Sequence, residues 1–416
     1  MLRRYISRPE QAVGWCLAFI LGGFLFYYAR YVIDVAVING PTVTMPDIAY
    51  HLLMAKAFWF DQIVDIYQLD AQLAVLSNFS GRPIHAAMPI GASPVAFLLW
   101  YPFAILSSFD LSLGYSSWVA FSAVVFVLAV WQIFIAQNDS PGSSRGEYGV
   151  GLLLVLCSYI CVQALLLGQT SLVACAIFVF VVAHGKRLPG GSINWPLVLC
   201  LIVLSVKPTY FVIGLATYLC CGLKRESAIG TLVVLVIVGI FAQVYGLHWL
   251  TGYFHSLNIY SQPEVIPEYR GSIVPETMIL FRTAFGSIMP EAQASHVGLF
   301  IWLASTVLII VLAPKFPERI LCCALLIGSF LLFAPYVGAY EDLLLIVLIA
   351  SIKPWRERTL ASQVGLIVFL AFIFLIFNRE VMFGRNLSPL LLWGFKLYLV
   401  SYACLRGANV VRYPRV

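Results

Sequence analysis

Residues 195–249 read WPLVLCLIVLSVKPTYFVIGLATYLCCGLKRESAIGTLVVLVIVGIFAQVYGLHW, and this stretch decides the class of the protein. Its apolar runs are interrupted only by Lys207-Pro208 and by a short turn that carries Lys224-Arg225. A helix needs about 20 apolar residues to cross the hydrocarbon of a bilayer, and the run 228–249 meets that length. The two shorter runs before it predict half-helices that meet at Pro208, where the helical hydrogen-bond ladder must break.

The same pattern extends over the rest of the chain. Hydrophobic residues make up 61% of the 416 and charged residues only 11%, with a mean hydropathy of +0.93. Soluble domains are about one quarter charged, so this chain cannot cover a water-facing surface. Further apolar runs cover 12–33, 91–107, 115–136, 150–167, 170–184, 298–313, 320–337, 339–351, 360–377 and 389–405. The sequence therefore predicts an all-α polytopic membrane protein, a single integral membrane domain over 1–416 with about 11–13 transmembrane helices.

Short clusters of Lys and Arg lie between the apolar runs and indicate the orientation. Because such clusters stay in the cytoplasm, we expect the N-terminus, the 184–194 loop and the C-terminal tail to be cytoplasmic. The loops of about 34–90 and 250–297 then share the opposite side, and the first of them is large. In a bacterium this would be the inner, or cell, membrane. A cavity lined by the two loops is the expected site.

Two further predictions concern local breaks and bound groups. The run 91–107 contains Tyr101-Pro102, which predicts a re-entrant hairpin rather than a full crossing. The net charge of +6 does not indicate nucleic acid, because the basic residues are accounted for as topology markers. The ten cysteines show no metal-ligand spacing, so neither a metal nor a cofactor is expected.

Ionisable residues beside apolar runs are costly and mark candidate sites. Asp47 follows Pro46 at the start of a predicted interfacial helix, where it acts either as a helix cap or as a functional carboxylate. Lys207 either extends to the membrane interface or binds an anion. Both Lys207 and Arg282 are expected at the outer end of an apolar segment, where a cation lacks a partner and suits a phosphate.

Three further polar positions have equally plain structural interpretations. Glu341-Asp342 precede an apolar run, as acids that cap a helix N-terminus do. Gln169, in Gly168-Gln169-Thr170, suits a turn between two helices, where its amide would satisfy backbone groups. Taken one by one, none of these positions specifies a function.

Their order along the chain resembles glycosyltransferase family 87, a family of polytopic C-type glycosyltransferases. The resemblance covers roughly residues 15–350. Its motifs are the stretch from Asp47 to Tyr67, the pair Pro94 and Pro102, Gly168-Gln169, the Lys207-Pro208 break with Lys224-Arg225 after it, and Pro335-Tyr336 followed by Tyr340-Glu341-Asp342-Leu343.

The resemblance implies an inverting transfer of a sugar from a polyprenyl-phosphate donor to a lipid- or glycan-linked acceptor on the non-cytoplasmic face. It implies that Asp47 is the general base on the acceptor hydroxyl. Polyprenyl phosphate leaves as a stable anion, so Lys207 and Arg282 replace the metal of nucleotide-sugar enzymes. The residues expected to bind substrate are Tyr50, Gln169, Tyr340, Glu341 and Asp342.

Two other functions stay open. A transporter or flippase of a lipid-linked glycan would share the bundle, the broken helices and a cationic cavity. An inactive family member would act as a membrane scaffold, since Ile48, Ala92 and Thr170 depart from the family pattern. In each case membrane lipids are partners.

Overall fold

The computed structural model describes residues 9–34, 46–81, 83–84, 90–136, 161, 164–165, 167–184, 192–261, 291–316, 319–334, 339–345, 347, 394, 396–398 and 400–401. Every regular element in these ranges is helical, which confirms the all-α prediction for this part of the chain. The elements are α2 (Pro9–Ile33), α3 (Asp47–Trp59), α4 (Leu69–Ser80), α5 (Pro94–Phe109), α6 (Leu111–Ala136), α9 (Ser171–His184), α10 (Trp195–Leu204), α11 (Pro208–Cys220), α12 (Lys224–Tyr245), α13 (Leu247–Ser261), α16 (Glu291–Leu312), α17 (Arg319–Phe333) and the short 3₁₀ helices η3 (Ala313–Lys315) and η4 (Ala339–Leu344).

The predicted half-helices are present. Helix α10 ends at Leu204 and helix α11 begins at Pro208, with Lys207 between them in an extended conformation at φ −117° and ψ 129°. Pro208 takes the first position of its helix, where its missing N–H costs no hydrogen bond. The break at Lys207-Pro208 is therefore encoded locally.

The predicted break at Tyr101-Pro102 is wrong. Helix α5 runs without interruption from Pro94 to Phe109 and holds Pro102 in its interior. A proline there removes one bond of the ladder, and packing against neighbouring helices compensates for it. Trp100, beside it, is 1% exposed in that packing.

Among the described residues, two helices are long and apolar enough to cross a membrane: Leu111–Trp131 within α6, and α12. The other apolar helices there are shorter, and the runs 150–167, 360–377 and 389–405 lie wholly or largely outside the described residues. The two long helices differ in their surroundings. Helix α6 is mostly buried, whereas α12 presents Leu232, Leu235 and Val244 outward at 60%, 62% and 64% exposure.

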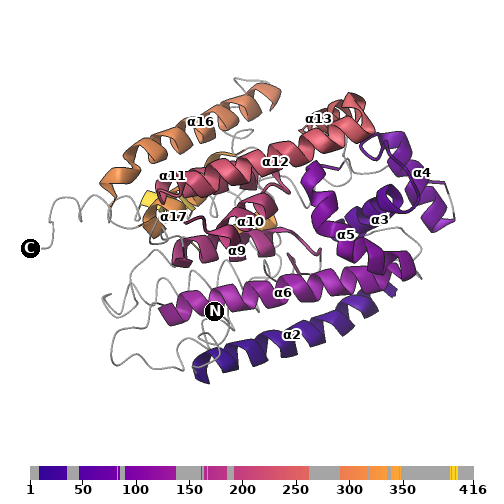
Figure 1. Ribbon diagram of the computed structural model, residues 1–416, viewed down its shortest axis with the longest axis horizontal. Coiled ribbons are helices and arrows are strands. Elements are labelled where there is room, and N and C mark those ends of the chain that lie inside the picture. Colours follow the sequence, from indigo (N-terminus) through magenta and orange to yellow (C-terminus); the bar gives the residue numbers. More distant parts are fainter. Residues whose placement is uncertain are drawn as a thin grey trace, which may run out of the picture.

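The long helices α2, α6, α12 and α16 follow the longest axis of the molecule, and α3, α4 and α13 gather at one end of it (Figure 1). An aromatic cluster attaches this end group to the bundle. Phe58 of α3 contacts Phe97 of α5, Phe241 of α12 and Trp249 of α13. The Trp249 indole also donates to the carbonyl of Val64 at 2.9 Å. Helices from both predicted non-cytoplasmic loops are thereby fixed side by side.

Candidate functional site

Two breaks between helices, the turn before α9 and the segment between α10 and α11, contact the starts of α3 and α5. The amide of Ile48 donates to the carbonyl of Leu167 at 3.1 Å, which joins α3 to the turn before α9. The amide of Ser93 donates to the carbonyl of Val206 at 2.9 Å, which joins α5 to the break between α10 and α11. Backbone groups that lack a helical partner thus satisfy one another. Polar side chains next to these breaks are brought into one region.

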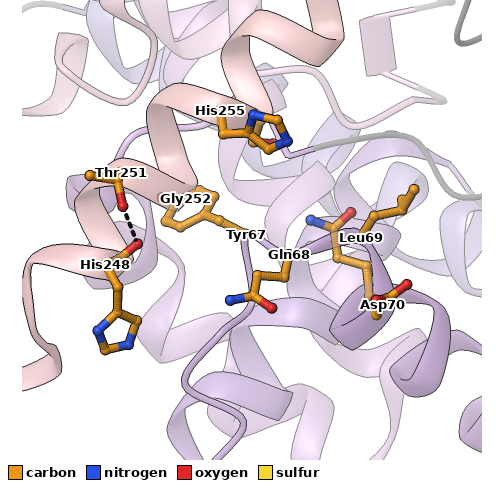
Figure 2. A pocket seen from close by; sticks show the side chains of 10 residues that line it. Tyr67, Gln68, Leu69, Asp70, His248, Thr251, Gly252 and His255 are labelled. Carbon is orange, nitrogen blue, oxygen red and sulfur yellow. Dashed lines mark hydrogen bonds between the residues drawn. The ribbon is translucent and has the colours of Figure 1, made fainter.

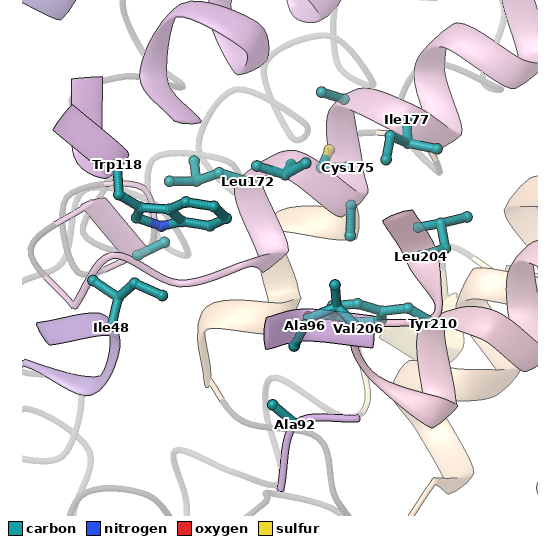
Figure 3. Close-up of a cluster of buried hydrophobic side chains, with 14 of the residues drawn as sticks. Ile48, Ala92, Ala96, Trp118, Leu172, Cys175, Ile177, Leu204, Val206 and Tyr210 are labelled. Atoms are coloured by element: carbon teal, nitrogen blue, oxygen red, sulfur yellow. The ribbon is translucent and has the colours of Figure 1, made fainter. Parts of the chain in front are cut away.

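Gly168 determines the close approach of the turn to α3. Its φ of +64° is in the left-handed region, and a Cβ at this position would overlap the side chain of Ile48. The Trp118 indole donates to the Gly168 carbonyl at 2.8 Å. Figure 3 shows Ile48 and Trp118 in the same apolar cluster as Val206 and Tyr210. Only glycine fits this turn, because it alone combines positive φ with the absence of a side chain.

Asp47 is held by a side chain and is not a helix cap. The cap of α3 is Pro46, which makes no side-chain capping bond, while the Asp47 carboxylate accepts a hydrogen bond from Nε2 of Gln169. The capping interpretation of Asp47 is therefore wrong. The sequence predicted that the Gln169 amide would satisfy backbone groups, and it did not predict this contact with Asp47. The two residues lie 122 positions apart in the sequence.

The environment of Asp47 shifts the pKa of its carboxyl. Desolvation by burial raises the pKa of the Asp47 carboxyl above its ordinary value, while the charge of Lys207 and the Gln169 hydrogen bond oppose the rise. The carboxylate of Glu341 adds a smaller upward contribution. A carboxylate with a raised pKa is a stronger base than an exposed one.

Lys207 is paired, so the expectation that this cation lacks a partner is wrong. Its Nζ lies 3.2 Å from Oε1 of Glu341, and its side chain is 25% exposed against 3% for Glu341. The Tyr210 hydroxyl donates to the same oxygen at 3.3 Å, and Nζ lies 5.3 Å from the centre of the Tyr210 ring. Glu341, inside η4, supplies the opposite charge. The run that Glu341 and Asp342 were expected to cap lies largely outside the described residues, so that interpretation stays a prediction.

The structure places the other candidates as follows. Tyr50 is buried, and its hydroxyl donates to Oε1 of Gln72 at 2.6 Å, so this group joins α3 to α4. The backbone of Tyr340 and Asp342 belongs to η4, but their side chains lie outside the described part of the chain. Arg282 lies outside the described residues altogether. The substrate contacts expected of these residues stay predictions.

Sequence reasoning missed His51, one turn after Asp47 on α3. Its ring stacks on Trp100 with centroids 4.8 Å apart and an interplanar angle of 13°. Its Nδ1 is buried without a hydrogen-bond partner among the described residues. Burial and the nearby Lys207 charge lower the pKa of His51 to about 3, so the imidazole is neutral at physiological pH. The spacing of four residues from Asp47 was the available signal, since such residues share a helix face.

A second polar feature is a cavity of about 540 Å³ between α4 and α13. Figure 2 shows Gln68 and Asp70 of one wall opposite His248 and His255 of the other. The cavity is thus bordered by residues at or near the two loops that were expected to line a site.

No protein-family model, curated protein or solved structure matches the chain. The chemistry of the site therefore rests on its own geometry. A carboxylate with a raised pKa can accept a proton, and an ammonium group beside it can hold an anion. The polar cluster, defined as Asp47, Gln169, Lys207 and Glu341, combines both capacities in one place.

Proposed function

We propose that this chain crosses the membrane several times. The outward faces of α2, α12 and α16 support the proposal, because large apolar side chains cover them. Examples are Ile20, Leu235 and Phe300, which are 71%, 62% and 72% exposed. Contiguous apolar surface of this kind is unfavourable in water and suits contact with lipid. The helices α3, α4 and α13 would then lie at the non-cytoplasmic end.

We infer that the protein is a membrane glycosyltransferase that uses a polyprenyl-phosphate sugar as donor. One observation carries the proposal: Asp47, Gln169, Lys207 and Glu341, which are widely separated in sequence, form one polar cluster inside an otherwise apolar helical body. Polar groups in such a body are costly and are typical of functional sites. The position of Asp47 at the start of a loop helix also suits a reaction at the membrane surface.

In the proposed reaction, Asp47 accepts the proton of an acceptor hydroxyl. The acceptor oxygen forms a bond to the anomeric carbon, and the bond between that carbon and the phosphate oxygen breaks, with inversion. The electron pair leaves with the polyprenyl phosphate. The Gln169 amide positions the carboxylate, as a second group beside a catalytic base does.

Lys207 stabilises the departing phosphate in this mechanism. An ammonium group has three N–H donors, so Lys207 can keep Glu341 as one partner and donate to a phosphate oxygen with another. Glu341 would fix the position of Nζ before the donor arrives. Charge stabilisation by a group already in place requires little reorganisation during the reaction.

Turnover of a radiolabelled donor by the protein reconstituted in vesicles tests this proposal. Polyprenyl-phosphate mannose, arabinofuranose, galactose and glucose are each supplied with a membrane lipid extract as the source of acceptor. We expect label from one donor to appear in a product that is covalently different from the donor. Movement of the intact donor lipid across the bilayer without such a product would identify a transporter. The absence of both sugar transfer and donor movement would indicate a scaffold.

A further inference from the structure

The cavity between α4 and α13 is separate from the polar cluster and remains unused by the proposed reaction. Its walls come from the segment 67–72 and from the first turns of α13 after Leu247. At about 540 Å³ it falls within the range of about 300–1,000 Å³ found for small-molecule sites. It therefore has the size of a ligand site.

The buried side of the cavity is held rigidly. The Tyr67 hydroxyl donates to the carbonyl of Ala92 at 3.0 Å, and the Ser256 hydroxyl donates to the carbonyl of Ile90 at 2.9 Å. Gln72 donates to the carbonyl of Ile66 at 2.8 Å while it accepts from Tyr50. Because these polar groups are already satisfied, the wall is formed before any ligand binds.

The open side of the cavity carries polar side chains that lack such hydrogen bonds. Gln68, Asp70 and His255 are exposed, and none has a side-chain hydrogen bond or ion pair within the part of the chain that the structure describes. His248, on the same side, pairs with Asp65 at 3.2 Å. Amide, carboxylate and imidazole groups together can both donate to and accept from hydroxyl groups.

The described residues of the wall favour one class of ligand over others. No Lys or Arg is among the described residues that line the cavity, so a phosphate would find no permanent cation. Tyr67 and Leu69 are the large apolar side chains among them, so the described wall favours a polar ligand over a lipid tail. A neutral polyhydroxylated ligand fits best.

We infer that this cavity binds the glycan portion of the acceptor, at a distance from the hydroxyl that reacts. The inference rests on the proposed function, which requires an acceptor rich in hydroxyl groups. Its link to the reaction centre is the hydrogen bond from Tyr50 to Gln72. Tyr50 lies one turn after Asp47 on α3, and Gln72 lines the cavity. One wall of the cavity is therefore joined directly to the helix that carries the base.

Binding of free saccharides to the purified full-length protein tests the inference. The probes are the methyl glycosides of mannose, galactose, glucose and arabinofuranose and the corresponding disaccharides, followed by saturation-transfer NMR. We expect at least one probe to bind. Thr251→Trp, which places a bulky ring at the exposed edge of the cavity, should abolish its binding. Asp70→Asn and His255→Ala should each weaken its binding by about tenfold, the loss typical of one hydrogen-bonding partner.

Matched controls separate the cavity from the rest of the surface. Asp61→Asn and His296→Ala change exposed residues of the same types elsewhere and should leave saccharide binding unchanged. Asp47→Asn should also keep saccharide binding. If no probe binds the wild type, or if binding survives all three cavity variants, the inference is wrong. If saccharides bind and the three cavity variants lose this binding, but no donor gives sugar transfer, the cavity is a saccharide site and the proposed reaction is wrong.

Discussion

Helices α3 and α4 both begin with an aspartate in their first turn, yet the two aspartates have different environments. Asp47 is partly buried, accepts from Gln169 and lies close enough to Lys207 for its pKa to respond. Asp70 is exposed and has no ion-pair or hydrogen-bond partner among the described residues. Neither residue is the cap of its helix. The same local signal thus occurs at a partly buried carboxylate in one helix and at a solvent-facing carboxylate in the other.

The largest effect on turnover is expected from Asp47→Asn. The amide keeps the size of the side chain but cannot accept a proton, so turnover should fall by about 100-fold or more while the melting temperature changes little. Asp70→Asn should instead raise the KM for acceptor and leave kcat near that of the wild type. Steady-state kinetics with the identified donor measures both. An Asp47→Asn variant with wild-type kcat would reject the assignment of the base.

The control for this comparison is Asp61→Asn. Asp61 is exposed in the same predicted loop and belongs to neither site. Its replacement should leave both kcat and KM unchanged.

The difference between Asp47 and Asp70 depends on the turn that holds Gln169. Gly168→Ala would introduce a Cβ that overlaps Ile48 at positive φ, so we expect a stability loss of about 3 kcal/mol and reduced turnover. Gly81, after α4, has nearly the same φ of +66° but no neighbour that a Cβ would meet. Gly81→Ala should therefore cost only about 1 kcal/mol of backbone strain and leave turnover intact. Thermal unfolding compares the two variants, and equal losses would contradict the close packing at Gly168.

Lys207→Met should weaken donor binding and also destabilise the protein by about 3 kcal/mol, because Glu341 stays buried without its cation. Adding Glu341→Gln should restore much of the stability but not the donor affinity. Lys224→Met changes an exposed lysine at the start of α12 and should affect neither property. A double variant that recovers donor affinity would show that Lys207 does not contact the phosphate.

The smallest effect concerns the pH dependence of turnover. Asp47 must be ionised to accept a proton, so the rate falls as pH falls through its pKa. Burial raises that pKa, and the Gln169 hydrogen bond lowers it. Gln169→Leu should therefore move the acid limb of the pH–rate profile to higher pH. Gln243→Leu, on the exposed face of α12, is the control and should leave the profile in place. A shift in the opposite direction would contradict the described contact.

Local signals in the sequence predicted most helix positions correctly. Proline at the start of a helix and glycine in a left-handed turn act on their own backbone, so the break at Pro208 and the turn at Gly168 were readable. The break predicted at Pro102 was wrong because neighbouring helices outweighed the local penalty. Apolar runs likewise predicted the helices outside the two long loops, whereas α4 and most of α13 lie in stretches that were expected to be loop.

The sequence by itself determined the helices of the apolar runs, the break at Pro208 and which polar residues need a reason to lie in apolar surroundings. Only the tertiary structure decided that Gln169 contacts Asp47 and that Lys207 pairs with Glu341, across 122 and 134 positions respectively. Helical periodicity is a local property of the backbone and the adjacent side chains. The partner and the pKa of a buried polar group depend on which distant surfaces exclude water around it, and that follows only from packing.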